Sequence, residues 1–251
     1  MQKIPVHVFP TRADAATQLA LETASLIKDN EAKGKHTVLG LATGDTPVPY
    51  YKELIKWHQE RGLSFATVTC FNLDEYTGLC RDHPQSYWQF MHNQLFQHID
   101  ILPENIHMPS GTVAEADIPA HCHAYEQAIL DAGGLDMQIL GIGRTGHIGF
   151  NEPGSPIDSR TRAVSLDPVT REDAARTFGG LAQVPTSAIT MGCGTILSAK
   201  RIVLMAWGNS KADIINQALN GSVNSSVSAS YLQRHPNTDF YIDAAAASAL
   251  S

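Results

Sequence analysis

Three polar segments of this 251-residue chain carry residue types that could catalyse a reaction on a small molecule. The first segment, 71–76, ends a predicted strand and contains the adjacent carboxylates Asp74 and Glu75. Apolar and aromatic neighbours partly desolvate such a carboxylate, which raises its pKa toward the range in which a general base works. An acidic pair taken alone is more commonly a solvated turn.

The second segment, 141–153, is rich in glycine and contains His147 and Glu152, which are close enough in sequence to share a pocket. A carboxylate that is hydrogen-bonded to an imidazole fixes the tautomer of the ring and raises its basicity. A lone histidine more commonly has a surface or packing role, but the density of glycine here suggests backbone pressed against a ligand. The glycines concerned are Gly141, Gly143, Gly146 and Gly149.

Three of these glycines also match the dinucleotide fingerprint GxGxxG, and Asp167 follows at the spacing of its acidic residue. That fingerprint requires a helix that begins at the third glycine. Pro153 and Pro156 would break such a helix. We therefore interpret the match as accidental, which argues against a nicotinamide-dependent dehydrogenase.

The third segment, 42–47, connects a buried strand to a helix, where free backbone N–H groups form a natural anion site. Gly44 permits close approach of the backbone, Thr46 can cap the helix, and Pro47 suits its first position. A tight turn explains the segment equally well, and Asp45 would have to point away from a bound phosphate. The segment is not a P-loop, because it lacks GxxxxGK[ST].

Two cations stand out near the predicted strand ends. Arg176 lies in a polar segment, 167–178, and Lys211 lies at the start of a helix. Arginine gives a two-pronged contact to phosphate and lysine a point charge, although each residue taken singly is more commonly a solvated surface group. Because the net charge is −7, an anionic substrate would depend on a few local cations such as these.

Alternating strand and helix patterns position these segments. Such alternation predicts a three-layer α/β/α sandwich with a mostly parallel, Rossmann-like, doubly wound sheet. Ligands then bind beyond the carboxyl ends of the strands, near a switch in strand order. We expect a single domain over 1–251 whose alanine-rich tail, 244–251, frays. The expected strands are 4–9, 37–42, 65–72, 135–143, 161–166, 201–207 and 239–243, and the expected helices are 12–29, 47–61, 86–99, 117–132 and 210–220.

Composition excludes several classes of protein. With 43% apolar and 17% charged residues the chain is an ordinary globular protein. The sequence shows no basic run, no long apolar run and no signal peptide. We therefore expect no nucleic-acid partner, no membrane span and a cytoplasmic location. The four scattered cysteines are expected to be reduced. His121, Cys122 and His123 would not face one another on a helix, so no metal site is predicted.

Together the segments resemble the glucosamine-6-phosphate deaminase/isomerase family over nearly the whole chain. The matching motifs include LGLATGDTP, CFNLDEYTGL, HPQSYWQFM, LGIGRTGHIGFNEPGS, SRTR, VPTSAITMG and GNSKA. The resemblance implies conversion of glucosamine 6-phosphate and water into fructose 6-phosphate and ammonia. Neither opening the sugar ring nor moving its C2 proton requires a redox cofactor or a metal, so no cofactor is expected.

The resemblance also implies roles for individual residues. Asp74 matches the base that takes the C2 proton and returns it at C1. His147 matches the group that assists ring opening, and Glu152 matches its orienting carboxylate. Expected substrate contacts, mainly to the phosphate, are Thr43, Gly44, Asp45, Thr46, Gly143, Arg176 and Lys211.

The chain departs from the family pattern at three places. Thr145 stands where the family commonly carries Asp or Asn, and threonine cannot stabilise an imidazolium by charge, so we expect slower ring opening and a gain in turnover from Thr145→Asp. Asp45 replaces a small residue. Ser155 and Arg162 match the residues of allosteric members, but Pro156 and Val164 do not, which predicts no activation by N-acetylglucosamine 6-phosphate.

Two other functions stay open at this stage. A 6-phosphogluconolactonase would need the phosphate loop and the histidine but not the base Asp74. A non-catalytic sugar-phosphate sensor usually carries a DNA-binding helix pair, for which no segment is left over. The sequence does not separate glucosamine from galactosamine 6-phosphate, and a homo-oligomer is compatible with it.

Overall fold

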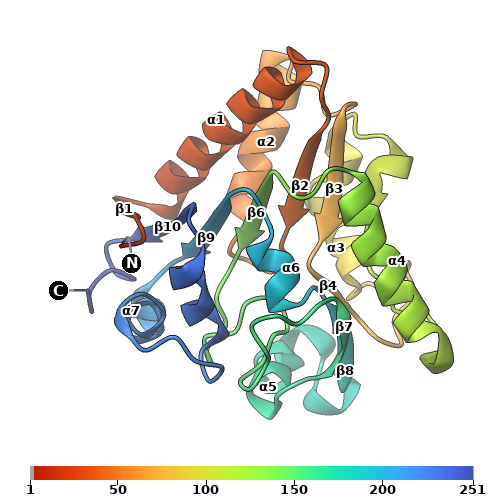
Figure 1. Cartoon of the computed structure of the whole chain (residues 1–251), viewed down its shortest axis with the longest axis vertical. Coiled ribbons are helices and arrows are strands. Elements are labelled where there is room, and N and C mark those ends of the chain that lie inside the picture. The colour runs from red at the N-terminus through yellow and green to blue at the C-terminus, as the bar shows by residue number, and fades with distance from the viewer. Residues whose placement is uncertain (1–2, 251) are drawn as a thin grey trace.

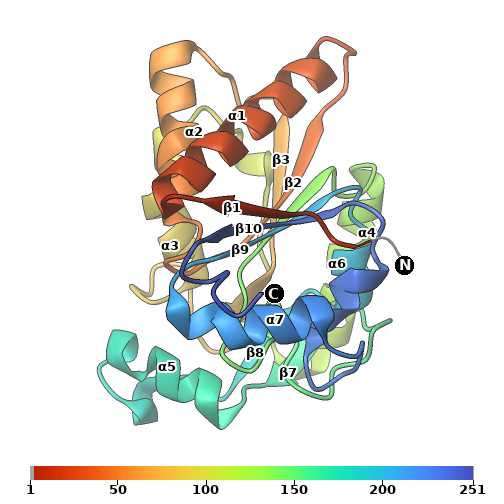
Figure 2. The ribbon, with the colours of Figure 1, turned by 90° about the vertical axis from the view of Figure 1, so that its left-hand side faces the viewer.

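A seven-stranded parallel sheet forms the centre of the chain in a computed structural model that describes residues 3–250. The strands follow the order β1-β10-β9-β6-β2-β3-β5, and every pairing between them is parallel. Helices α1, α2 and α3 cover one face, and α4, α6 and α7 cover the other (Figures 1 and 2). The expected three-layer, doubly wound α/β fold is therefore confirmed.

The bounds of the elements are close to those expected for the long ones. The sheet strands are β1 Val6–Phe9, β2 Thr37–Leu41, β3 Val68–Asn72, β5 Ile106–His107, β6 Met137–Leu140, β9 Ile202–Ala206 and β10 Thr238–Asp243. The helices are α1 Arg12–Glu31, α2 Val48–Arg61, α3 Tyr87–Gln94, α4 Ile118–Asp131, α5 Pro168–Phe178, α6 Cys193–Leu197 and α7 Ala212–Asn220. Short 3₁₀ turns span Phe96–His98, Pro103–Asn105, Glu115–Asp117, Leu181–Gln183, Asn209–Lys211 and Ser228–Arg234. None of the described helices is long and apolar enough to cross a membrane.

Local chemistry explains why the main elements form where they do. All five residues of β2 are buried, as expected of a strand covered on both faces. Thr11 and Asp14 form a reciprocal capping box at the start of α1, and Leu19 and Ile27 bury the inner face of that helix. At α2 the expectation was wrong: Pro47 occupies the N-cap position, one residue later than expected, and no side chain caps the helix. The carbonyl of Thr46 accepts the indole N–H of Trp207 at 3.1 Å.

The strand order reverses between β2 and β6. From β2 the chain winds outward through β3 to β5, then returns to the other side of β2 with β6 and winds outward again through β9 and β10. The loops that leave β2 and β6 at their carboxyl ends are the segments 42–47 and 141–153. The sheet therefore brings two of the three polar segments together at the switch point, where such folds bind ligands.

A second, antiparallel sheet lies beyond the carboxyl ends of the central strands. Its strands are β4 Asp74–Tyr76, β8 Ser187–Thr190 and β7 Arg162–Ser165, with β8 in the middle. Figure 1 shows β4, β7 and β8 below the main sheet, with α5 beside them. This sheet was not expected from the sequence, although segment 161–166 was expected to be a strand. It turns Asp74 back toward the switch point.

The described part of the alanine-rich tail packs against the fold, and Ser251 lies outside the described residues. Residues 244–249 form turns, and Ala246 is buried with its N–H donated to Asp243 at 2.8 Å.

Candidate active site

Two adjoining cavities open at the switch point. The inner one has a volume of about 190 Å³ and is lined by Asp74, His147 and Gly149 together with the loop after β2. The outer one, about 470 Å³, lies under α5 and includes Lys211 in its wall. Both cavities contact His147, Gly143, Tyr87 and Phe150, so they form one continuous site.

Asp74 is the first residue of β4 and only 6% exposed. The backbone of Gly149, at φ +56°, passes so near that a β-carbon there would lie 3.4 Å from the carboxylate of Asp74 and 3.0 Å from the hydroxyl of Thr190. Burial, with a smaller contribution from the charge of Glu75, raises the pKa of Asp74 to about 8. A carboxylate with a pKa in this range exchanges protons effectively near neutral pH.

Glu75 does not share this cavity, although it follows Asp74 directly. Successive side chains of a strand point to opposite faces, and Glu75 points toward the start of α3. Its carboxylate accepts hydrogen bonds from the backbone N–H groups of Tyr76 at 2.9 Å, Tyr87 at 3.0 Å and Trp88 at 2.9 Å. Of the acidic pair, only Asp74 is placed to act on a ligand in the cavity.

His147 is held through its Nδ1 atom. The hydroxyl of Thr145 lies 2.8 Å from Nδ1, and a carboxylate oxygen of Glu152 lies 3.1 Å from the same atom. None of the described residues forms a hydrogen bond with Nε2 of His147, so this nitrogen is free for a ligand. Gly143 packs directly on the ring, since a β-carbon there would lie 2.1 Å from imidazole atoms.

Glu152 stays ionised beside this ring. Burial alone would raise its pKa, but the contact with His147 and hydrogen bonds from Thr170 and Asp167 outweigh burial and hold the pKa below its usual value. The hydroxyl of Thr170 donates to the second carboxylate oxygen at 2.6 Å. A fixed carboxylate at Nδ1 favours the tautomer with its proton on Nδ1 and stabilises the imidazolium when Nε2 takes a proton.

The carboxylate of Glu152 bears on the expectation of slow ring opening. Thr145 carries no charge, but Glu152 places one at the same nitrogen of His147. Thr145→Asp would place a second carboxylate against Glu152, and two like charges at one site raise the pKa of one of them. Slow ring opening and a gain in turnover from Thr145→Asp stay predictions, and the charge of Glu152 argues against both.

The loop after β2 borders both cavities. Thr43 and Thr46 line the inner cavity, whereas Gly44 and Asp45 line the outer one. Gly44 adopts φ +88°, a left-handed conformation that favours glycine. The loop therefore lies where an anionic end of a ligand would reach from the inner cavity into the outer one.

The cations of the site differ in part from those expected. Lys211 lines the outer cavity, where its ammonium donates to the carbonyl of Ile142 at 2.8 Å and burial lowers its pKa. Arg176, in contrast, is exposed on α5 and lines neither cavity. Arg144 lines the outer cavity and pairs with Asp173 of α5 at 2.7 Å. Sequence reasoning missed Arg144 and Tyr87, although both stand inside the quoted motifs.

The glycine-rich segment also differs from its interpretation. Gly143 is pressed against the segment's own histidine, and Gly149 against Asp74 and Thr190, so both glycines serve close packing within the protein. No helix begins at Gly146, because residues 141–160 form turns and loops. The dinucleotide fingerprint therefore lacks the helix that it requires.

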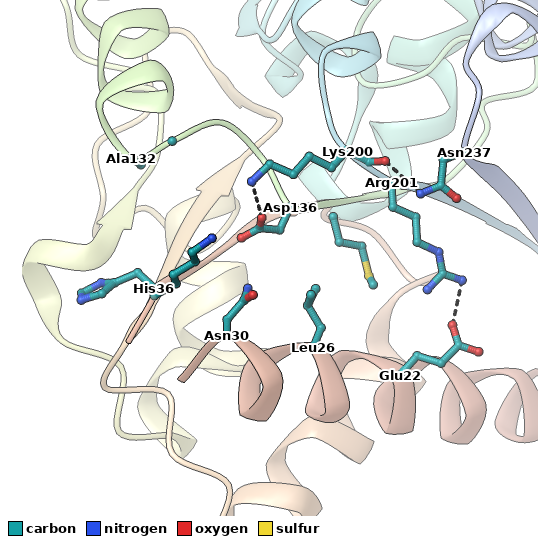
Figure 3. Close-up of a pocket in the computed structure, with 12 residues that line it drawn as sticks. Glu22, Leu26, Asn30, His36, Ala132, Asp136, Lys200, Arg201 and Asn237 are labelled. Atoms are coloured by element: carbon teal, nitrogen blue, oxygen red, sulfur yellow. Dashed lines mark hydrogen bonds and ion pairs between the residues drawn. The ribbon is translucent and has the colours of Figure 1, made fainter. Parts of the chain in front are cut away.

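A larger cavity of about 660 Å³ lies at the opposite, amino-terminal ends of the strands (Figure 3). Four of its charged groups form two ion pairs: Lys200 contacts Asp136 at 2.6 Å, and Arg201 contacts Glu22 at 2.7 Å. These pairs tie α1 and the β6 region to β9. No titratable group there faces the cavity with a chemistry like that of Asp74.

No group of three or more His, Cys, Asp or Glu side chains among residues 3–250 could hold a metal ion. His121 instead accepts the backbone N–H of Ser110 at 3.1 Å.

Known proteins similar to this chain fall into one family. The family model described as "Glucosamine-6-phosphate isomerases/6-phosphogluconolactonase" matches residues 10–240. Glucosamine-6-phosphate deaminase 2 of Bacillus subtilis is 48% identical over 95% of this chain and 96% of its own length. A putative glucosamine-6-phosphate deaminase-like protein of Bacteroides thetaiotaomicron is 42% identical over 98% of this chain, which spans only 37% of that longer protein.

Solved structures give the same picture. A monomeric glucosamine-6-phosphate deaminase is 43% identical and superimposes with a TM-score of 0.93, covering 98% of this chain and all of its own. The 6-phosphogluconolactonase of Trypanosoma brucei covers the whole of both chains with a TM-score of 0.77 but only 18% identity, which establishes a shared fold alone.

Proposed function

Because the chain belongs to the glucosamine-6-phosphate isomerase/6-phosphogluconolactonase family, we propose that it is a glucosamine-6-phosphate deaminase, which converts glucosamine 6-phosphate and water into fructose 6-phosphate and ammonia. The observation that carries the proposal is the buried carboxylate of Asp74, with a pKa of about 8, in one cavity with the His147–Glu152 pair. A base of this kind is needed to move a proton between carbons. The identities of 42–50% to proteins named as deaminases support the same activity.

In the proposed reaction His147 acts first. Its Nε2 takes the proton of the C1 hydroxyl and delivers it to the ring oxygen as the bond between C1 and that oxygen breaks, which leaves an aldehyde at C1 and a hydroxyl at C5. Glu152 and Thr145 hold the ring through Nδ1 while its charge changes. Without this step the substrate has no free carbonyl, and its C2 proton is not acidic enough to remove.

Asp74 acts second. Its carboxylate takes the C2 proton while a proton of the substrate's ammonium group passes to the C1 oxygen, which leaves an enolamine. The protonated carboxyl then returns its proton to C1. The C2 carbon is now part of an imine, and water converts that imine into the ketone with release of ammonia. All bonds are made and broken by proton transfer and hydrolysis, so the proposed sequence needs no electron acceptor.

The phosphate is proposed to bind where the loop of Thr43, Gly44, Asp45 and Thr46 meets Lys211 in the outer cavity. The backbone N–H groups before α2 and the ammonium of Lys211 suit a dianion. Binding energy from the phosphate, remote from C1 and C2, holds those carbons against Asp74 and His147. Arg176 stays a proposed phosphate contact, although α5 would have to reorient to bring its guanidinium to the cavity.

Lys211→Ala is expected to raise KM for glucosamine 6-phosphate by about 10- to 100-fold, the usual effect of losing a charged hydrogen bond. The rate with unphosphorylated glucosamine is expected to change little, because the lost contact is to the phosphate. Steady-state kinetics with both sugars measure this. An equal loss of activity with both sugars would contradict a phosphate-binding role for Lys211.

Activation by N-acetylglucosamine 6-phosphate is expected to be absent. The guanidinium of Arg162 is engaged by Asn151 at 2.9 Å and by Ser155 at 3.0 Å, which leaves less of it for an effector. Initial rates plotted against substrate should be hyperbolic with and without that compound. A sigmoidal curve that the compound makes hyperbolic would overturn the prediction.

Ammonia release from a panel of phosphorylated amino sugars tests the proposed function, with hydrolysis of 6-phosphogluconolactone as the control activity. The panel includes galactosamine 6-phosphate, because the proposal does not distinguish it from glucosamine 6-phosphate as the substrate.

A cytoplasmic location in amino-sugar metabolism belongs to the same proposal, supported by four cysteines that are all free. A homo-oligomer stays an untested expectation beside a solved relative described as monomeric.

A further inference from the structure

Glu75 is a buried carboxylate that the proposed reaction does not use. It is 3% exposed and lies next to the base Asp74 in β4, but on the opposite face of the strand. Burial raises its pKa, while backbone N–H groups that donate to it favour the ionised form. Burying a carboxylate costs free energy unless it is well hydrogen-bonded, so its partners indicate what it does.

Those partners join two elements that are separate in the sequence. One oxygen of Glu75 accepts the N–H groups of Tyr76 and Tyr87, at 2.9 and 3.0 Å, and the other accepts that of Trp88 at 2.9 Å. Tyr87 and Trp88 are the first two residues of α3, whose N–H groups have no partner within the helix. The third, that of Gln89, is taken by the hydroxyl of Ser86 at 3.1 Å.

The connection reaches the inner cavity on both sides. Tyr87 lines that cavity, and its hydroxyl lies 3.3 Å from the hydroxyl of Tyr76. Asp74 lines the same cavity from β4. Because Glu75 of β4 accepts two N–H groups from the start of α3, a shift of β4 along α3 would move Asp74 relative to Tyr87 and break both of these hydrogen bonds.

We propose that Glu75 is the positioning residue of this site: its carboxylate locks β4 to the start of α3 and thereby fixes Asp74 against Tyr87 on the wall of the inner cavity. This inference rests on the proposed function only in so far as Asp74 is the base. The negative charge of Glu75 has a second effect, because it opposes ionisation of Asp74. Four other titratable groups interact electrostatically with Asp74 or line the cavity with it. They are Tyr76, Tyr87, Tyr125 and His147.

Glu75→Gln tests the proposal with little change in volume. The amide oxygen can still accept two of the N–H groups, but the amide nitrogen cannot accept that of Trp88, and the charge is lost. We expect kcat for ammonia release to fall about tenfold or more with KM changed less than about threefold. We also expect the titration midpoint of Asp74, followed by carboxyl NMR and assigned with Asp74→Asn, to fall by about one pH unit or more.

Ser86→Ala is the matched control, because it removes the other cap of α3 without touching β4. It is expected to lower Tm as much as Glu75→Gln while leaving the midpoint of Asp74 unchanged. If Glu75→Gln keeps both the kcat and the Asp74 midpoint of the parent protein, or if Ser86→Ala reproduces its effects, Glu75 only caps a helix and the proposal is overturned. The NMR measurement does not depend on the substrate, so a parent protein that releases no ammonia would sink the proposed function alone.

Discussion

Asp74→Asn is expected to lower kcat for ammonia release from glucosamine 6-phosphate by about 10²- to 10⁴-fold, the usual contribution of a general base. Asparagine has nearly the shape of aspartate but cannot accept a proton at neutral pH. Since the variant leaves the phosphate contacts proposed for the outer cavity in place, KM is expected to change by less than about threefold. Exchange of the C2 proton with deuterated water measures the affected step directly and should stop in the variant.

The same variant separates the proposed function from its rival. A lactonase on this fold would use the phosphate loop and the histidine, so its hydrolysis of 6-phosphogluconolactone would survive Asp74→Asn. Full retention of ammonia release in the variant would exclude Asp74 as the base. Lactone hydrolysis that survives in the variant, in a protein that releases no ammonia, would point to the rival activity.

The pH dependence of the parent protein follows from the raised pKa of Asp74. The base must be ionised to accept a proton, and its pKa in the free protein is about 8. On its acidic limb kcat/KM is therefore expected to rise with pH, by about tenfold per pH unit, and to level off above about 8. A plateau that begins near pH 5 would show that Asp74 is not desolvated as its burial indicates.

Thermal stability supplies a control for folding. The pKa of Asp74 is raised from 3.8 to about 8, so folding favours its protonated form. The stability that this group contributes is present below pH 3.8 and is lost as the pH rises through about 8. Asparagine does not titrate, so Tm of Asp74→Asn should exceed that of the parent protein increasingly as the pH rises. A variant that is both inactive and less stable at pH 9 would indicate a folding defect instead.

The sequence predicted the parts of the site that depend on the central sheet. The strand of residues 37–41 has a continuous apolar pattern and the strand ending at Leu140 a mostly apolar one, so the two loops that follow them could be located in advance. Their meeting at a switch in strand order is a general property of doubly wound folds. His147 and Glu152 lie in one of these loops, and their separation of only five positions was enough to suggest a shared pocket.

The second sheet could not be predicted from the sequence. For the same reason the sequence could not tell whether Asp74 or Glu75 enters the cavity. β4 has only three residues, and it pairs with β8, in which Thr190 lies opposite Asp74. Because β8 is far along the chain, no local periodicity reveals this pairing. Which carboxylate enters the cavity depends on that pairing, because neighbouring side chains of a strand face opposite ways. The hydrogen bond from Thr170 to Glu152 likewise depends on where α5 packs.

The helix α5 was read only as a polar segment, although a local signal was present. Asp167 accepts the N–H of Val169 at 2.8 Å as an N-cap, and Pro168 occupies the first helical position, a combination that marks helix starts. The orientation of the helix, which leaves Arg176 exposed and puts Asp173 beside Arg144, is set by tertiary packing. Sequence reasoning therefore placed the loop after β2 at the cavities correctly but misplaced the arginine that was expected beside it.

His147→Gln is expected to lower kcat by about 10²- to 10⁴-fold through a different step from Asp74→Asn. Glutamine fills much of the space of the imidazole but has no group that exchanges protons near neutral pH. Ring opening then becomes rate-limiting, because the closed sugar must open without a proton donor, whereas removal of the C2 proton by Asp74 is untouched.

Substrate deuterated at C2 distinguishes these two steps. If removal of the C2 proton limits the rate of the parent protein, its kcat should show a primary isotope effect. In His147→Gln this isotope effect should shrink toward unity, because ring opening, an earlier step, then limits the rate. Glu152→Gln is the partner variant, since it leaves Nε2 in place but removes the charge that contacts Nδ1 at 3.1 Å. The double variant should be scarcely slower than His147→Gln, because residues that act as one unit give non-additive losses. If the losses multiplied instead, or if His147→Gln kept an undiminished isotope effect, His147 and Glu152 would not act together in opening the ring.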